Sequence, residues 1–238
     1  MKKNQLVSVC MRVHEIGDCL SRTIEWLVER FEEINVVDSG QSTDNTTAIL
    51  NSYKNQINLY TRPFDNFQNQ TNFILEKNTK PWFLAIDGDE IIYSQWTMDQ
   101  IAQLLEKQDK TLAIFDRINF QKDIYHKQPV RSDYQYRLFK SSKRATGQMH
   151  DLYDISVERC MFIPKVLMLH WGHIRSRDRL IEKTQIYKKF INIDSADGAM
   201  IKEHDDWFAQ RNVEWDANAI KLVDSKLIEY VEKWDAIK

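Results

Sequence analysis

The chain is poor in the residues that mark several classes of protein. It has 3 Cys among 238 residues, and Cys10, Cys19 and Cys160 form no Cys-x-x-Cys pair. An odd number without that spacing argues against a disulfide framework or a zinc knuckle, so a reducing cytoplasm is the expected compartment. Only 6 Gly and 4 Pro are present, which excludes collagen-like and linker-like sequences.

Long apolar runs are missing as well. No stretch approaches the roughly 20 apolar residues of a membrane-spanning helix, so we expect no transmembrane segment and only peripheral membrane contact. The apolar run that begins at Leu6 is interrupted by Arg12, His14 and Glu15, and a strand is a better interpretation of it than a signal peptide.

An excess of charge of one sign is also absent. The 33 basic and 35 acidic side chains leave a net charge of −2, so no general affinity for polyanions is expected. The distribution is uneven, because the segment from Arg137 to Lys189 holds twelve basic and five acidic residues. That segment forms either an ordinary solvated surface or a surface that binds an anionic ligand.

The hydrophobic pattern predicts a single α/β domain over residues 1–238, with a mixed, mainly parallel sheet flanked by helices. Its first half, 1–95, alternates strands and helices, and its second half, 96–238, adds mixed strands and C-terminal helices. The expected strands are Leu6–Val13, Glu33–Asp38, Ile57–Thr61, Trp82–Ile86, Leu112–Phe115, Tyr134–Phe139 and Val166–His170. The expected helices include one capped by Asp18, then Ala48–Tyr53, Phe67–Glu76, Ile101–Leu105, Arg179–Ile193 and Ala217–Trp234.

Two carboxylates follow the most apolar of these strands. Asp87 and Asp89 flank Gly88 directly after Trp82–Ile86, and the missing Cβ of Gly88 would let a ligand approach the backbone. Carboxylates this close repel one another unless a cation lies between them. Mg²⁺ or Mn²⁺, held by carboxylates and substrate phosphates, suits this pattern. A solvated acidic loop is the alternative, but the position after a buried strand favours the metal site.

Asp38 also ends a predicted buried strand and precedes a glycine, Gly40, by two residues. Its carboxylate either binds a nucleobase or ribose hydroxyl, or forms a cap or Asx-turn within its own loop. The carboxyl ends of parallel strands share one sheet edge, which is where open α/β sheets bind ligands. We therefore expect Asp38 and Asp87 to border one crevice.

Five ordered segments together resemble glycosyltransferase family 2. They are Val7–Met11, Val36–Gly40, Ser42–Thr46, Asn72–Glu76 and Ala85–Glu90. The resemblance covers about the first 95 residues and implies a GT-A (Rossmann-like) fold, a nucleotide-diphosphate sugar donor, with a UDP-sugar as first choice, and Mn²⁺ or Mg²⁺. It also implies transfer to an acceptor hydroxyl, usually with inversion at the anomeric carbon.

The resemblance implies roles for residues of the first half. Asp38 corresponds to the carboxylate that reads the base, with Gly40 beside it. Val13, His14 and Glu15 correspond to the wall of the nucleoside site, and Asp87 and Asp89 to the metal-binding pair, with Asp89 as the direct ligand.

Further candidates lie in the second half. Asp151, next to His150, matches the position of a general base that removes the acceptor's proton; a surface His-Asp turn is the alternative. His170 resembles a histidine that completes the metal or diphosphate site, although a structural histidine is the commoner case. Arg175 and Arg177 follow it and could close over the donor diphosphate.

The acceptor class stays open at this level. The basic half fits a glycan, a lipid-linked sugar or a modified nucleic acid, and Tyr134, Tyr136, Trp171 and Trp207 either stack on sugars or bases or belong to the core. The alternatives to a sugar transferase are a nucleotidyltransferase, whose Gly-rich basic loop is missing, and an inactive carbohydrate-binding relative.

Overall fold

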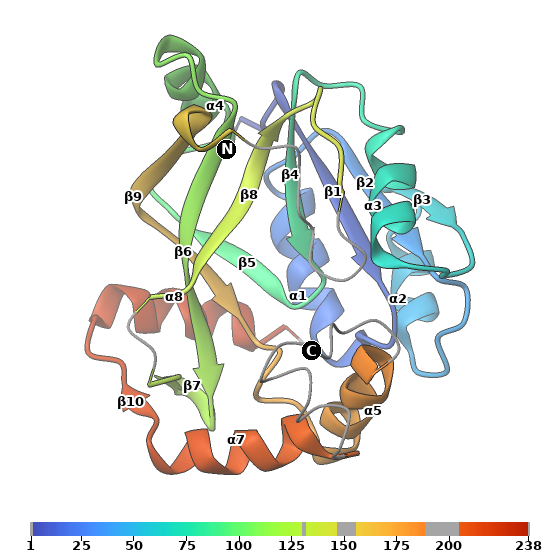
Figure 1. Ribbon diagram of the computed structural model, residues 1–238, viewed down its shortest axis with the longest axis vertical. Coiled ribbons are helices and arrows are strands. Elements are labelled where there is room, and N and C mark those ends of the chain that lie inside the picture. The colour runs from blue at the N-terminus through green and yellow to red at the C-terminus, as the bar shows by residue number, and fades with distance from the viewer. Residues whose placement is uncertain (1, 130–131, 147–155, 189–204, 238) are drawn as a thin grey trace.

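The computed structural model describes residues 2–129, 132–146, 156–188 and 205–237. Its strands form one ten-stranded sheet that runs through both halves of the chain (Figure 1). They are β1 (Val7–Val13), β2 (Ile34–Asp38), β3 (Asn58–Thr61), β4 (Trp82–Asp87), β5 (Glu90–Tyr93), β6 (Leu112–Gln121), β7 (Asp123–Lys127), β8 (Tyr134–Lys140), β9 (Cys160–His170) and β10 (Ile220–Lys221). The helices are α1 (Gly17–Val28), α2 (Thr46–Ser52), α3 (Phe67–Leu75), α4 (Met98–Lys107), the 3₁₀ turn η1 (Val157–Arg159), α5 (Arg177–Lys188), α7 (Trp207–Ala217) and α8 (Ser225–Asp235).

The first half of the sheet is parallel, in the order β3-β2-β1-β4. Val13 at the end of β1 pairs with Asp38 on one side, and Arg12 pairs with Asp87 on the other. The predicted shared edge is therefore present, and both strand-end carboxylates flank the end of β1. The expected mixed α/β architecture is confirmed.

The second half of the sheet brings a distant strand to the Asp-Gly-Asp turn. β8 pairs antiparallel with β4, β6 with β8, and β9 runs parallel to β6. The short strand β5 follows the turn and pairs antiparallel with β9, so that Glu90 lies opposite His170. This register places residue 170 beside residues 87–90.

Strand β4 is buried on both faces, as its continuous apolar pattern predicts. Trp82, Leu84 and Ile86 point into the larger core, which includes apolar residues of α1, α4 and α8. Phe83 and Ala85 point the other way, into a smaller core under α3. Figure 1 shows α1 behind the sheet, α3 on the other face, and α5 and α7 below the carboxyl ends of β1 and β4.

Two local predictions are wrong. The helix expected over Ala217–Trp234 begins only at Ser225, as α8. Residue 217 is the last of α7, and β10, which pairs with β7, lies between the two helices. Helix α8 starts where Asp224 accepts hydrogen bonds from the N–H groups of its first turn. Asp18 does not cap α1 either, since its carboxylate binds Arg175 instead.

The end of the helix expected over Arg179–Ile193 lies outside the described residues. Among the helices of the described ranges, none combines the length and apolar character that a bilayer crossing requires.

Candidate active site

Asp38 lies at the end of β2 with its side chain buried. Its Oδ1 accepts a hydrogen bond of 3.2 Å from the N–H of Gly40, and its Oδ2 accepts one of 3.2 Å from Thr47 Oγ1. The Asx-turn considered for this carboxylate is thus present. Gly40 has φ +70°, a conformation that glycine adopts without strain, and so the loop after β2 turns sharply at the sheet edge.

At the end of β1, some side chains are buried and others are exposed. Val13 is buried and His14 is exposed, with its Nδ1 2.9 Å from Ser39 Oγ. Glu15 adopts φ +49° and turns its carboxylate inward, where it accepts from the N–H of Thr43 and pairs with Arg179 at 2.6 Å. Burial opposes ionisation of Glu15, but these two partners outweigh it and lower its pKa.

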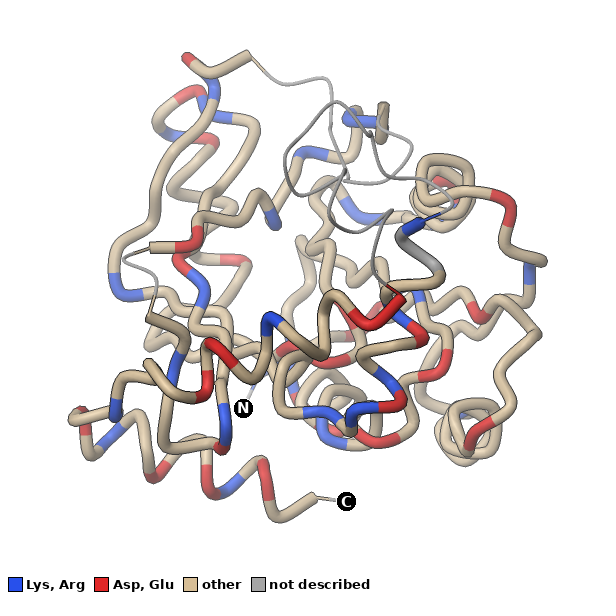
Figure 2. The backbone as a smooth tube through the Cα atoms, turned by 60° about the horizontal axis from the view of Figure 1, so that its bottom comes forward, with Lys and Arg blue, Asp and Glu red and all other residues tan. Residues whose placement is uncertain are grey.

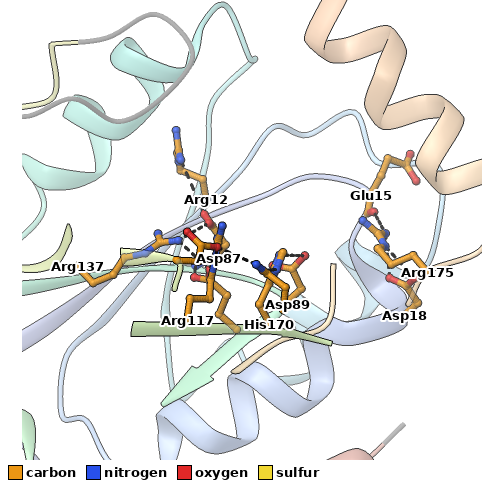
Figure 3. Close-up of polar contacts among 12 residues, drawn as sticks. Arg12, Glu15, Asp18, Asp87, Asp89, Arg117, Arg137, His170 and Arg175 are labelled. Carbon is orange, nitrogen blue, oxygen red and sulfur yellow. Dashed lines mark hydrogen bonds and ion pairs between the residues drawn. The ribbon is translucent and has the colours of Figure 1, made fainter. Parts of the chain in front are cut away.

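Asp87 lies between two arginines (Figure 3). Its Oδ2 is 3.1 Å from Arg137 Nη2, and its Oδ1 is 3.8 Å from Arg12 Nη2. Burial acts against the charged form, yet Arg137 and Arg12 outweigh it and lower the pKa of Asp87. About 40 % of the side chain stays exposed, so the carboxylate is both ionised and accessible.

Glu90, which the sequence did not single out, anchors the Asp-Gly-Asp turn. It is fully buried, and its Oε1 is 2.8 Å from Arg137 Nη2 and 3.2 Å from Arg117 Nη1. Its Oε2 accepts a hydrogen bond of 3.0 Å from the N–H of Asp87. Arg137 thereby joins Glu90 to Asp87, and the turn is held by charge-assisted hydrogen bonds.

Asp89 faces His170, with 3.4 Å between Asp89 Oδ2 and His170 Nε2. Both side chains are about nine-tenths buried. Burial raises the pKa of Asp89, but His170, Arg175 and Lys183 outweigh it, so the pKa lies well below its ordinary range. The other ring nitrogen of His170, Nδ1, is 2.6 Å from Asn119 Oδ1. A carboxylate oxygen and an imidazole nitrogen therefore point at one another.

Two glycines shape this part of the site. A Cβ on Gly172 would collide with His170 Nε2 and would lie 2.7 Å from Asp89 Oδ2, so only glycine fits against this pair. A Cβ on Gly88 would lie 3.2 Å from Ile16 and 3.3 Å from Leu20. The bare side of Gly88 therefore faces helix α1, and the glycine serves the packing of that helix.

The residues at Asp89 fit a divalent cation with few protein ligands. Within the described ranges no three His, Cys, Asp or Glu side chains are grouped closely enough to hold a metal by themselves. Asp89 and His170 supply one oxygen and one nitrogen, and Mn²⁺ or Mg²⁺ at a diphosphate takes its remaining ligands from phosphate and water. Asp87 fits less well as a direct ligand of the cation, because its carboxylate already pairs with Arg137 and Arg12.

Two of the arginines after β9, Arg175 and Arg179, form ion pairs with the first half of the chain, and Figure 3 shows those of Arg175. Arg175 contacts Asp18 through two hydrogen bonds of 2.9 and 3.0 Å and donates to the carbonyl of Glu15. Arg179 bridges Glu15 and Asp44. Arg177 pairs with Asp206 at 2.7 Å and is 60 % exposed. The pairs of Arg175 and Arg179 attach the start of α5 to the loops around α1 and α2.

These pairs account for much of the basic excess between residues 137 and 189. Arg137, Arg175 and Arg179 bind carboxylates of the first half, and Figure 2 shows acidic and basic positions interspersed over the described chain. The net charge of −2 is therefore partly a cancellation between neighbours in space.

The proposed general base and the four aromatic candidates remain to be placed. Asp151, with its neighbour His150, lies outside the described residues. Trp171 and Trp207 are buried and belong to the core, whereas Tyr134 is 57 % and Tyr136 is 47 % exposed on β8. Of these four aromatic candidates in the described chain, the two tyrosines are the ones exposed to solvent.

Several residues of the site were missed in the sequence. Arg12, Arg117 and Lys183 contribute charge around Asp87 and Asp89. A charged residue within an otherwise apolar strand, such as Arg12 in β1, is a usable signal in retrospect. No local pattern distinguishes Lys183, because its approach to Asp89 depends on where α5 lies in the folded chain.

Comparisons with known proteins agree with this geometry. The pattern of the family described as Glycosyl transferase family 2 matches residues 8–167. The lipopolysaccharide core biosynthesis glycosyltransferase LpsC of Rhizobium meliloti is 42 % identical over 74 residues, which are 30 % of this chain and 27 % of LpsC. This chain thus aligns with about a quarter of the length of that relative.

Solved structures of S. aureus TarS share the fold. TarS 1–349 has a TM-score of 0.51 at 13 % identity, covering 90 % of this chain and 73 % of TarS 1–349. The same TarS segment in complex with UDP-GlcNAc has a TM-score of 0.51 at 13 % identity and covers 88 % and 72 %. This likeness shows the GT-A fold, and the family pattern spans more than half of the chain. The chain belongs to glycosyl transferase family 2.

Proposed function

We propose that this protein is a metal-dependent glycosyltransferase that moves a sugar from a nucleotide-diphosphate sugar to an acceptor hydroxyl. The observation that carries the proposal is the pairing of Asp89 with His170 at 3.4 Å, beside Asp87, on the sheet edge where Asp38 also lies. Family membership supports the same chemistry. A cytoplasmic location remains a prediction from the sequence.

A UDP-sugar is the proposed donor, since crystal structures of TarS contain UDP and UDP-GlcNAc. Asp38, Val13 and His14 surround the end of β1 and β2, where the nucleoside would bind. For Asp38 this requires its carboxylate to accept a ligand in addition to Gly40 and Thr47, and each oxygen has a second lone pair for that purpose.

Asp89 and His170 would hold Mn²⁺ or Mg²⁺, and the cation would supply positive charge to the leaving diphosphate. The arginines beside Asp87 keep that carboxylate ionised. Arg175 and Arg177 remain proposed diphosphate contacts. Arg175 reaches a ligand only by releasing Asp18, whereas Arg177 is already largely exposed.

Asp151 is the proposed general base of an inverting transfer. A carboxylate that takes the proton of the acceptor hydroxyl allows the oxygen to attack the anomeric carbon from the face opposite the diphosphate. Asp151→Asn should abolish transfer and leave donor affinity unchanged. Transfer at the wild-type rate would remove Asp151 from the mechanism.

The acceptor is proposed to be a glycan or a lipid-linked sugar. Tyr134 and Tyr136 present exposed rings on β8, the strand that also carries Arg137, which contacts Asp87. A modified nucleic acid would require a continuous basic surface, and the pairing of the arginines after β9 with carboxylates disfavours it.

A thermal-shift panel tests the proposal. UDP-, GDP-, dTDP- and CMP-sugars are added with and without Mn²⁺, because a ligand that binds the native state raises the melting temperature. We expect stabilisation by one nucleotide-sugar, dependent on Mn²⁺, and its loss in Asp89→Asn and Asp87→Asn. Asp109→Asn is the matched control, since Asp109 pairs with Arg159 elsewhere on the surface and its φ of +52° suits Asn. Stabilisation that survives in Asp89→Asn would refute the metal site.

A further inference from the structure

Behind His170 lies a buried polar chain that the proposed reaction does not use directly. Asn119 of β6 pairs with His170 in the register between β6 and β9, and it is 4 % exposed. Its Oδ1 lies 2.6 Å from His170 Nδ1, and its Nδ2 lies 2.8 Å from Asp133 Oδ2. The three side chains thus form a line from Asp133 through Asn119 to the imidazole.

The hydrogen-bond donors at Asp133 determine how the Asn119 amide is oriented. Asp133 also accepts from Arg117 Nε at 2.8 Å and from Gln135 Nε2 at 2.6 Å. Burial opposes its ionisation, but Arg117 and Asn119 outweigh it and lower its pKa. An ionised carboxylate can only accept, so Asn119 must turn its NH₂ group to Asp133 and its carbonyl oxygen to His170.

The carbonyl oxygen of Asn119 in turn determines which nitrogen of His170 carries the proton. An amide oxygen accepts hydrogen bonds and cannot donate them, so Nδ1 must be the protonated nitrogen. In the neutral imidazole the lone pair is then on Nε2, the nitrogen that faces Asp89 Oδ2 at 3.4 Å. In the opposite tautomer, Nε2 would carry a hydrogen and donate it to Asp89, so the imidazole would be lost as a ligand.

We propose that Asn119 and Asp133 are positioning residues that hold His170 in the Nδ1–H tautomer and so keep Nε2 available to a cation at Asp89. This inference rests on the metal site of the proposed function. Asn119 of β6 and Asp133, the residue before β8, would thus orient one of the two proposed ligands. Outer partners of this kind orient metal-binding histidines in other proteins.

The first readout needs no metal. Long-range ¹H–¹⁵N spectra of ¹⁵N-histidine-labelled protein distinguish Nδ1–H from Nε2–H imidazoles, and His170→Gln assigns the signal. We expect Nδ1–H in the wild type and in Gln135→Ala, which removes one bond to Asp133 without touching Asn119. In Asn119→Ala and Asp133→Asn we expect a shift towards Nε2–H, because the amide oxygen is removed or free to turn.

The second readout is the affinity for Mn²⁺ alone, measured by electron paramagnetic resonance of the free ion. Asn119→Ala should weaken binding about 10–100-fold, while Gln135→Ala keeps the wild-type affinity. Asp133→Asn preserves shape and serves as the second variant if Asn119→Ala does not fold.

The outcomes separate this inference from the function on which it rests. If the wild type binds Mn²⁺ through Asp89, and a folded Asn119→Ala or Asp133→Asn protein keeps both tautomer and affinity, the positioning role is wrong and the metal site stands. An Nε2–H signal for His170 in the wild type overturns the positioning role as well. If the wild type binds no Mn²⁺, the metal site and the positioning role fail together.

Discussion

Replacing Glu90 by Gln should destabilise the protein more than any other single charge-neutralising change in the turn. Glu90 is fully buried and accepts three hydrogen bonds, from Arg137, Arg117 and the N–H of Asp87. Glutamine keeps the shape but presents an NH₂ group where one oxygen stood, so one of these donors loses its acceptor. Leaving a buried donor unpaired costs about 1–3 kcal/mol.

The lost charge adds to this cost. Hydrogen bonds to a charged group contribute about twice as much as neutral ones, so two guanidinium contacts weaken by about 1 kcal/mol each. The total of about 3–5 kcal/mol agrees with the loss seen when one partner of a buried ion pair is removed. For a chain of this size that corresponds to a fall of roughly 6–20 °C in melting temperature.

Urea unfolding followed by tryptophan fluorescence and far-UV circular dichroism measures the effect. Glu29→Gln is the control, because Glu29 forms a half-exposed pair with Arg30 and such pairs contribute less than about 1 kcal/mol. If Glu90→Gln lowers the free energy of unfolding as little as Glu29→Gln does, the reasoning is refuted. In a double-mutant cycle, Glu90→Gln and Arg137→Met should be non-additive, since each removes the other's partner.

Three further predictions follow from the same contacts. Gly172→Ala should weaken Mn²⁺ binding at least tenfold, by titration, with far-UV circular dichroism unchanged, because the added Cβ meets His170 Nε2 and Asp89 Oδ2; unchanged affinity would contradict the close approach. The lowered folded-state pKa values of Glu15, Asp89 and Asp133 mean that the unfolded chain binds more protons in acid. Their stabilisation is therefore complete above the ordinary carboxyl values of about 4 and is lost as the pH falls below them; urea midpoints from pH 7 to 2 measure this, and Asp133→Asn should show a shallower acid limb. Arg179→Met should release α5 from Glu15 and Asp44, so amide exchange over Arg177–Lys188 should accelerate. Exchange rates equal to those of the wild type would mean that the other contacts of α5 are sufficient to hold it.

The sequence determined the parts of this protein that depend on local pattern. Alternation of short apolar strands with helices predicted the parallel half of the sheet. The apolar strand before Asp87 predicted burial on both faces, and both are present. The position of Asp38 and Asp87 after parallel strands was enough to place them at one edge, because that edge is common to all parallel strands. The ordered motifs predicted the family.

Tertiary structure decided everything that depends on partners far apart in the chain. Glu90 looks like an ordinary acid after Asp89, and only the approach of Arg117 and Arg137 makes it the anchor of the turn. Arg175 looked like a free basic residue, yet it pairs with Asp18, 157 positions away. Local sequence cannot encode these pairings, because charges and hydrogen bonds act through space and their partners meet only when strands and helices have packed.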